Sequence, residues 1–342
     1  MLIIVLFEGL NGFWFKSQLE KNLLYLNALY DIDIQIDSSD YYPNTDKISY
    51  RRNDYGLRTD CKNPENVDIV IMGGSTTDQR YINFENSFSY LLQEKLSYHN
   101  EGNYCVANAG VDGHQLSTHI NSLEMWFPLI PSFSPSYYVL NIGLNDAVLT
   151  KSATDNDESI VSTLTSRIKF AIIRNSYLYA FIKKIRNLIG ISTDRYGVLT
   201  HKKNIGNEFE YTARKRSNEF ERDIINNAIL FGEKLNEAID IIKDRTALPI
   251  CVSQKALFTR EGKGISKAFP YKNSHLNGLD LQYSLDLINS QIEAVCSEKG
   301  AIVVDINKAH FTDDDFYDFV HHNPSGSTKL AKLIYASIRD KL

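Results

Sequence analysis

The chain has 342 residues, of which 43% are hydrophobic and 23% are charged. This length and composition are typical of a folded protein with one large or two ordinary domains, and they exclude a largely disordered chain. The net charge is −5 at pH 7, and no dense block of Lys and Arg is present. Because a nucleic-acid binder needs a basic face to neutralise phosphates, this charge argues against nucleic acid as the main partner.

Residues 1–65 come before the first predicted strand. They start with MLIIVLF (1–7), an apolar segment that Glu8 interrupts and that is too short to span a bilayer or to act as a cleavable signal peptide. We expect it to be either the end of a membrane anchor that starts further upstream, which would allow membrane association, or a strand or helix packed on the domain. Clusters such as SSDYYPNTD (38–46) are turn-like. We predict that residues 1–65 form an extension that wraps the sheet of a domain spanning 66–342.

Five short apolar runs rich in β-branched residues recur along the rest of the chain, each followed by turn residues and a helical pattern. Continuous hydrophobicity on both faces is typical of strands in a covered parallel sheet. The alternation of strands and helices predicts a doubly wound α/β sandwich, in which reactive groups gather beyond the carboxyl ends of the strands. The predicted strands are VDIVIMG (67–73), YCVANAG (104–110), SYYVLNIG (136–143), LPICVSQ (248–254) and AIVVDIN (301–307), and the predicted helices are at about 86–98, 115–127, 218–246, 279–298 and 324–341.

Residues 151–217 separate the third and fourth predicted strands and do not fit this alternation. Within them, RIKFAIIRNSYLYAFIKKIRNLI (167–189) interleaves basic and apolar residues. The pattern predicts an amphipathic helix with a solvated basic face, and a helix on a membrane surface is the alternative. We therefore interpret 151–217 as an insertion, either packed on the sandwich or forming a cap above the site.

The four cysteines, at positions 61, 105, 251 and 296, form no CxxC pair and no zinc-ligand spacing. Cys105 and Cys251 fall within predicted buried strands, where a free thiol packs as a small hydrophobic group. We therefore expect no disulfides, which favours a reducing compartment.

The first predicted strand ends in GGSTTDQRY (73–81). Two glycines before Ser75 let the backbone bend tightly at a strand-to-helix turn and leave the hydroxyl exposed, as a nucleophile requires. An ordinary Ser/Thr turn or helix N-cap is the alternative interpretation. The missing GxxxxGK[ST] pattern and its Lys argue against a phosphate-binding loop.

Candidate hydrogen-bond donors follow the next two strands. NAGVDG (108–113) places Gly113 where a backbone N–H has no side chain to shield it, and NIGLND (141–146) places Asn145 just past a strand end. An amide in either place can donate to an oxyanion that develops during acyl transfer. An ordinary loop glycine and an ordinary turn asparagine are the alternatives.

A candidate base lies in DFVHHNPSG (318–326), where Asn323 and Pro324 mark the start of a helix. The spacing of three residues lets the Asp318 carboxylate reach His321 and orient its imidazole. His322 is one residue further from Asp318 and is the second candidate. A metal site is a lesser alternative, because no ligand spacing such as HExxH is present. Its candidate ligands are His310, Asp313, Asp314, Asp315, Asp318, His321 and His322.

In chain order, a Ser after the first strand, a Gly after the second, GxND after the third and DxxH before the last helix resemble the four blocks of the SGNH (GDSL-like) hydrolases. The resemblance runs from about residue 67 to the C-terminus. It implies a three-layer α/β/α sandwich with a parallel, flavodoxin-like sheet of five strands, and it implies no metal or organic cofactor. The implied nucleophile is Ser75, with Asp318 and His321 completing the triad and with Ser75, Gly113 and Asn145 forming the oxyanion hole.

Two departures from the family pattern surround Ser75. GGS replaces the usual GDS, with Gly74 in place of the Asp, and Gln79 and Arg80 stand near the place where the family has a glycine. The stretch YRRNDYGLR (50–58) is similar to SGNH proteins of bacterial cell envelopes. It favours a cell-envelope location, with the cytoplasm as the alternative.

The resemblance implies a serine esterase that hydrolyses O-acyl, above all O-acetyl, esters of a small molecule or a polysaccharide. An O-acetyltransferase that acts on a cell-envelope polysaccharide would use the same residues, with a sugar hydroxyl in place of water. A carbohydrate-binding protein that keeps the fold without catalysis is the third interpretation.

Overall fold

The structure is a computed structural model that describes residues 16–38, 47–99, 103–148, 212–213, 215–216, 220–262, 265–268 and 276–342. The apolar segment 1–7 and the basic stretch 167–189 lie outside the described residues. The chain divides into two compact units, Met1–Ala28 with Thr150–Lys202 and Leu29–Leu149 with Lys203–Leu342. None of the described helices has the length and hydropathy needed to cross a membrane.

In the first unit, the described residues form one helix, α2 (Gln18–Tyr25). It begins at a capping box, in which the Ser17 hydroxyl accepts a hydrogen bond from the Glu20 amide (3.2 Å) and the Glu20 carboxylate accepts one from the Ser17 amide (2.8 Å). This exchange satisfies two amides that the first helical turn leaves without partners.

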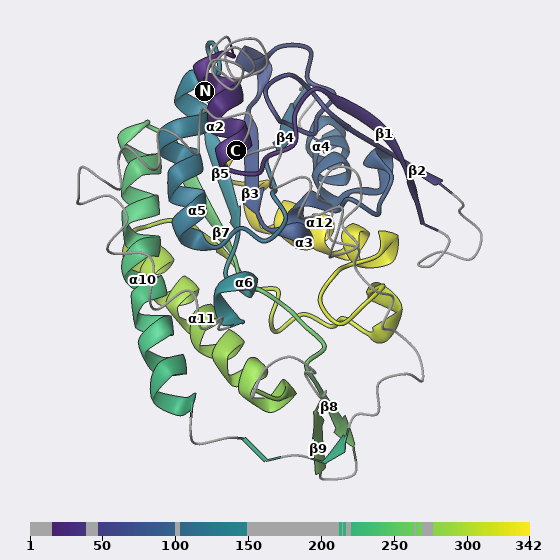
Figure 1. Cartoon of the computed structure of the whole chain (residues 1–342), viewed down its shortest axis with the longest axis vertical. Helices are drawn as coiled ribbons and strands as arrows, with labels where there is room; N and C mark the ends of the chain where they lie inside the picture. The colour runs from purple at the N-terminus through teal and green to yellow at the C-terminus, as the bar shows by residue number, and fades with distance from the viewer. Residues whose placement is uncertain are drawn as a thin grey trace, which may run out of the picture. The chain divides into compact units, whose positions relative to one another are not determined.

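The second unit contains a five-stranded sheet in which every pair of neighbours is parallel (Figure 1). The strand order is β10-β7-β5-β3-β4, so β3, the first strand of this sheet in the sequence, lies between the second (β4) and the third (β5). This is the flavodoxin-like order, and it confirms the predicted fold class. Each strand falls within one of the predicted apolar runs: β3 (Ile69–Gly73), β4 (Val106–Asn108), β5 (Tyr137–Asn141), β7 (Leu248–Val252) and β10 (Ile302–Val304).

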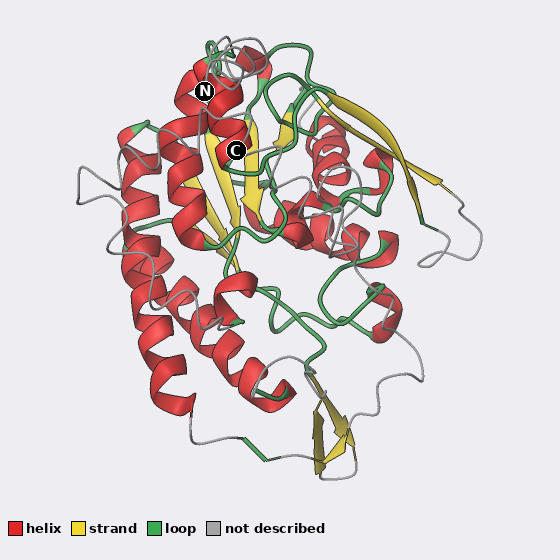
Figure 2. Cartoon of the chain, viewed as in Figure 1, coloured by secondary structure: helices red, strands yellow, loops and turns green. Residues whose placement is uncertain are grey.

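Helices cover both faces of this sheet and make the three layers (Figure 2). One face packs on α4 (Phe88–His99) and α12 (Pro324–Ile338), and Ile69, Ile71 and Val139 join these helices in one buried core. The other face packs on α10 (Glu221–Asp244) and α11 (Gly278–Glu298).

The predicted helix over 115–127 forms in pieces. α5 (Leu116–Asn121) continues into a π-helical turn over Ser122–Trp126 and a 3₁₀ turn over Phe127–Leu129. Pro128 has no amide hydrogen to donate, so the α-helical pattern cannot continue through it.

Two small sheets were not predicted from the sequence. β1 (Ile32–Asp37) and β2 (Lys47–Arg52) form an antiparallel hairpin inside the predicted extension, in the same unit as the large sheet. In β2 the buried positions are Ile48, Tyr50 and Arg52, and the inward Arg hides the alternation that would have identified a strand. The second sheet joins β6 (Thr212–Ala213), β9 (Ile265–Ala268) and β8 (Thr259–Gly262).

The prediction that the cysteines stay free is wrong. Cys61 is bonded to Cys105 and Cys251 to Cys296, so no described cysteine is a free thiol. The partners are 44 and 45 residues apart in the sequence. Spacing rules detect local pairs, whereas these pairs are formed by packing, in the second case of β7 against α11.

Gln79 follows α3 (Ser75–Asp78) and adopts a left-handed backbone, with φ of 48°. A glycine adopts this conformation at the least cost. The Gln79 side chain compensates, because its Nε2 donates to Ser327 Oγ on α12 (2.7 Å) and its Oε1 accepts from the Phe88 amide at the start of α4 (2.8 Å). One side chain therefore connects the Ser75 turn to two helices of the same layer.

We predict that Gln79→Gly destabilises the protein although it relieves the backbone. A glycine would relieve about 1 kcal/mol of backbone strain. Loss of the Gln79 side chain would leave the buried Phe88 amide and the buried Ser327 hydroxyl without their partner, at a cost of about 1–3 kcal/mol each. Ser132→Gly is the matched control, because Ser132 has φ of 55° and an exposed side chain. Urea unfolding should show a clear decrease in the free energy of unfolding for Gln79→Gly and a change within about 1 kcal/mol for the control. Equal effects of the two substitutions would contradict the role of the side chain.

Candidate active site

Ser75 lies at the first position of α3, directly after β3. Gly74 is the N-cap of this helix, and a Cβ at this position would come within 2.5 Å of Asn145 Nδ2. Any side chain at position 74 would therefore displace the Asn145 amide. The glycine that departs from the GDS pattern thus lets the β5 loop approach Ser75.

The structure brings Ser75, His321 and Asp318 into one hydrogen-bonded chain. His321 Nε2 lies 2.8 Å from Ser75 Oγ, and His321 Nδ1 lies 2.6 Å from Asp318 Oδ2. The other carboxylate oxygen of Asp318 accepts from the backbone amides of Val320 (2.8 Å) and His321 (2.7 Å). A carboxylate held in this way keeps the imidazole with its proton on Nδ1, so that Nε2 presents its lone pair to the Ser75 hydroxyl.

The Asp318 carboxyl is charged at neutral pH although it is buried. Burial alone would raise its pKa, but the neighbouring His321 and two backbone amides lower the pKa below its ordinary value. The imidazole plane is also fixed, because the Tyr317 ring stacks on His321 with centroids 5.3 Å apart and an interplanar angle of 5°. The arrangement can therefore accept a proton from Ser75 without reorienting the ring.

Asn145 and Gly113 lie on different loops, the first after β5 and the second after β4. Asn145 is on α6 (Leu144–Ala147) beyond β5, and its Nδ2 donates to the His114 carbonyl (2.8 Å), which leaves the second hydrogen of the amide for another acceptor. Gly113 occupies a turn that the His114 amide closes on the Val111 carbonyl (3.2 Å), and its φ of +76° is one that glycine adopts without strain.

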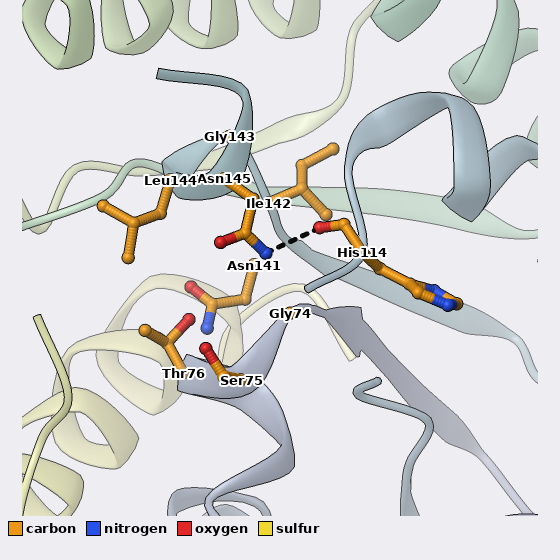
Figure 3. Close-up of a pocket in the computed structure, with 9 residues that line it drawn as sticks. All are labelled: Gly74, Ser75, Thr76, His114, Asn141, Ile142, Gly143, Leu144 and Asn145. Carbon is orange, nitrogen blue, oxygen red and sulfur yellow. Dashed lines mark hydrogen bonds between the residues drawn. The ribbon is translucent and has the colours of Figure 1, made fainter. Parts of the chain in front are cut away.

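A small pocket opens beside Ser75, and Figure 3 shows Asn145 reaching across it from the β5 loop to the backbone of His114. Gly113 is absent from its lining, although the adjoining His114 contributes to it. The lining is polar and rich in glycine, with Ile142 and Leu144 as its aliphatic side chains. The residues that line it are Gly74, Ser75, Thr76, His114, Asn141, Ile142, Gly143, Leu144 and Asn145.

Asp146 connects this pocket to the preceding loop. Its Oδ1 accepts a hydrogen bond from the Leu116 amide (3.0 Å), which caps α5 just after the Gly113 turn. Burial raises the pKa of Asp146 to about 6. The Asp of the GLND stretch thus helps to hold the β4 and β5 loops together.

His322 points away from Ser75 and into an apolar layer. Its ring lies 5.0 Å from the Phe311 ring and 4.6 Å from the Phe316 ring, and neither ring nitrogen has a hydrogen-bond partner among the described residues. Asp315, a candidate metal ligand, is paired instead with Lys329 (2.7 Å). Within the part of the chain that the structure describes, no three His, Cys, Asp or Glu side chains are placed to hold a metal ion.

Sequence reasoning missed a buried charged cluster beside Ser75. Asp78 Oδ1 accepts from Tyr50 OH (2.5 Å) and Arg52 Nη2 (2.6 Å), and Asp78 Oδ2 pairs with Arg80 Nη2 (3.0 Å). Burial alone would raise the pKa of Asp78, but Arg52 and Arg80 hold it at about 2. Arg58 adds hydrogen bonds to the carbonyls that end α3. The sequence did contain a signal for this cluster. Its residues come from the stretch 50–58 and from the stretch after Ser75 that lacks the family's glycine.

No protein-family model matches this sequence, and no curated protein matches it either. Solved structures are similar to it. Axe2, an acetylxylan esterase from Geobacillus stearothermophilus, is 13% identical with a TM-score of 0.44, and the match covers 79% of this chain and 93% of Axe2. A member of the lipolytic protein G-D-S-L family from Veillonella parvula is 13% identical with a TM-score of 0.44, over 80% and 98% of the two chains.

LAE5, an α/β hydrolase enzyme from the metagenome of Lake Arreo in Spain, is 14% identical with a TM-score of 0.42, over 79% and 93% of the two chains. At these identities and TM-scores, what these proteins do is said of them and is not transferred to this chain. The function proposed below rests on this chain's own side chains.

We predict that His322 makes the fold sensitive to acid. Burial lowers its pKa from an ordinary 6.5 to about 4, so between these values the unfolded chain binds a proton that the folded chain does not. Stability from this group is therefore full above pH 6.5 and falls as the pH drops towards 4, by about 2 kcal/mol between pH 7 and pH 5.

Urea unfolding at pH 7 and pH 5 measures this loss. His322→Leu should reduce the difference in unfolding free energy between the two pH values by about 2 kcal/mol. His310→Leu is the control, because the His310 side chain is exposed, and it should leave that difference as in the wild type. A His322→Leu variant with the wild-type difference would show that another group carries the acid sensitivity.

Proposed function

We propose that this chain is an SGNH-type serine esterase, with Ser75 as nucleophile, His321 as general base and Asp318 as the group that orients the base. The hydrogen-bonded chain from Asp318 through His321 to Ser75 carries the proposal. Ser75 is partly exposed at a pocket, whereas Asp318 and His321 are buried behind it. A nucleophile open to substrate and backed by a shielded base is what acyl transfer requires.

In the proposed reaction, His321 Nε2 takes the proton of Ser75 as Oγ attacks the ester carbonyl carbon. The carbonyl oxygen becomes an oxyanion, and the Ser75 amide, the Gly113 amide and the Asn145 side-chain amide donate to it, each worth about 3 kcal/mol of barrier. The C–O bond then breaks, and His321 returns the proton to the leaving alcohol. Water then attacks the acyl-serine and gives a proton to His321. His321 passes this proton to Ser75 Oγ as the bond between Oγ and the acyl carbon breaks, which releases the acid and restores Ser75.

We infer that the acyl group is short, and acetyl is the simplest that fits. Among the described residues, the pocket beside Ser75 has only Ile142 and Leu144 as aliphatic walls, and both are buried. Such a pocket offers little apolar surface to a long acyl chain, whose affinity would come from buried CH₂ groups at about 0.8 kcal/mol each. The alcohol is a small molecule or a saccharide, and acetylated xylose and xylan are the test substrates.

The two disulfides bear on where the enzyme works. Disulfides persist in oxidising compartments and are rare where glutathione keeps thiols reduced. Cys61–Cys105 and Cys251–Cys296 therefore support the cell envelope over the cytoplasm as the location of this chain.

The proposal predicts that Ser75→Ala and His321→Ala each lower kcat on p-nitrophenyl acetate by roughly 10⁴–10⁶, because the triad acts as a unit. The double variant should lose little more. His322→Ala is the control, because it removes an adjacent buried imidazole that makes no contact with Ser75, and it should keep most of the activity. Circular dichroism confirms that each variant is folded. Near-wild-type turnover by folded Ser75→Ala would refute the nucleophile, and silencing by His322→Ala alone would refute the base.

Asn145→Ala should lower kcat by roughly 10²–10³ and leave KM nearly unchanged, because an oxyanion donor acts chiefly in the transition state. Asn145→Asp is the isosteric comparison, and it should be at least as damaging because it replaces the donor with an anion. Steady-state kinetics on p-nitrophenyl acetate separate the two constants. An effect confined to KM would mean that Asn145 only positions the substrate.

A further inference from the structure

The turn that carries Gly113 is connected to the Ser75 segment directly and also through Arg52 of β2. At its start, Arg52 Nη2 donates to the Gly110 carbonyl. One residue before Gly113, Asp112 Oδ2 lies 3.6 Å from Arg80 Nη1. Between these points, the Val111 amide donates to the Gly73 carbonyl (2.9 Å), which belongs to the end of β3.

Both guanidinium groups are anchored on one carboxylate. Asp78 lies at the last position of α3, three residues after Ser75, and binds Arg52 through Oδ1 and Arg80 through Oδ2. The side chains of Arg52, Asp78 and Arg80 are 1%, 2% and 8% exposed. Opposite charges that are buried and bonded in this way hold a defined geometry, because neither partner can leave without exposing an unpaired charge to the protein interior.

We propose that Arg80 and Asp112 are positioning residues that set the separation between the Ser75 amide and the Gly113 amide. This inference rests on the proposed function, in which both amides bind the oxyanion. Arg80 reaches from the turn after the Ser75 helix to the residue next to Gly113, and neither Arg80 nor Asp112 lines the pocket. Oxyanion donors act only within about 2.7–3.1 Å of the charge, and a shift of about 1 Å can cost 100-fold in rate.

The role also explains why an Arg stands at position 80. The planar guanidinium places one Nη on Asp78 and the other on Asp112 at the same time, whereas a Lys ammonium presents a single point charge. Arg80 is further held over the Tyr50 ring, with its guanidinium carbon 5.7 Å from the ring centroid. Its geometry is therefore fixed before substrate arrives.

The test measures kcat and KM for p-nitrophenyl acetate in Asp112→Ala, Arg80→Lys and the double variant. Asp112 is the safer site to change, because its side chain is 16% exposed. We expect each single variant to lower kcat roughly tenfold with KM within about twofold, and the double variant to lose no more than the worse single one, because both remove one shared contact. The rate at which a fluorophosphonate labels Ser75 should fall by a similar factor.

Asp240→Ala is the matched control, since Asp240 pairs with Lys299 (2.7 Å) on the α10–α11 side of the sheet and lies away from the pocket. It should leave kcat at the wild-type value, and its urea midpoint shows how much the loss of an ion pair away from the pocket changes stability. A folded Asp112→Ala variant with wild-type kcat, or single losses that simply multiply in the double variant, would overturn the positioning role alone. A wild-type protein that neither hydrolyses the ester nor is labelled at Ser75 would overturn the proposed function and this inference together.

Discussion

The contact between His321 Nε2 and Ser75 Oγ is the one on which the geometry of the candidate site depends, because it joins residues 246 positions apart in the chain. β3 is an inner strand, so the turn that carries Ser75 has the β4 and β5 loops as direct neighbours. β10, however, lies at the far edge of the sheet from β4. The chain after β10 must therefore run back across the strand ends before α12 begins, and it brings His321 with it. Its path is supported where the Leu257 amide donates to the Phe319 carbonyl (2.7 Å) and where Gln79 binds Ser327.

A second constraint acts on the opposite side of Ser75. The turn after α3 contains no glycine. Its side chains instead hold it in place through hydrogen bonds and ion pairs. Gln79 ties the turn to α4 and α12, while Asp78 and Arg80 tie it to β2 and to the Gly113 turn. The hairpin β1–β2 is thereby part of the support for the Ser75 turn, although it lies outside the part of the chain that resembles the SGNH blocks. A loop-based site needs such support, since its precision comes from the elements that hold it.

The sequence predicted those parts of the fold whose signal is local. Continuous apolar runs identify β3 and β5 because both faces of these strands are buried. The spacing of Asp318 and His321 predicts their contact because one short turn brings the two groups together. The charged cluster and the disulfides depend on partners far apart in the chain, and no spacing rule reports such pairs. Arg52 is the clearest case. From the sequence alone an Arg is expected at the surface, and only the structure shows that Arg52 is buried in an ion pair with Asp78.

The adjacent imidazoles of His321 and His322 show how strongly surroundings decide the chemistry of a residue type. Phe316 lies opposite His322 in an antiparallel bridge, and the His321 and His322 side chains reach different surroundings. His321 meets a carboxylate on one nitrogen and a hydroxyl on the other, whereas His322 meets two phenyl rings and has its pKa lowered to about 4. The apolar side packs His322 against the phenyl rings, and the polar side places His321 between Asp318 and Ser75. An exchange of the two environments would require a shift of one residue in the loop, which Asp318 prevents by binding the amides of Val320 and His321 through the oxygen that His321 Nδ1 does not use.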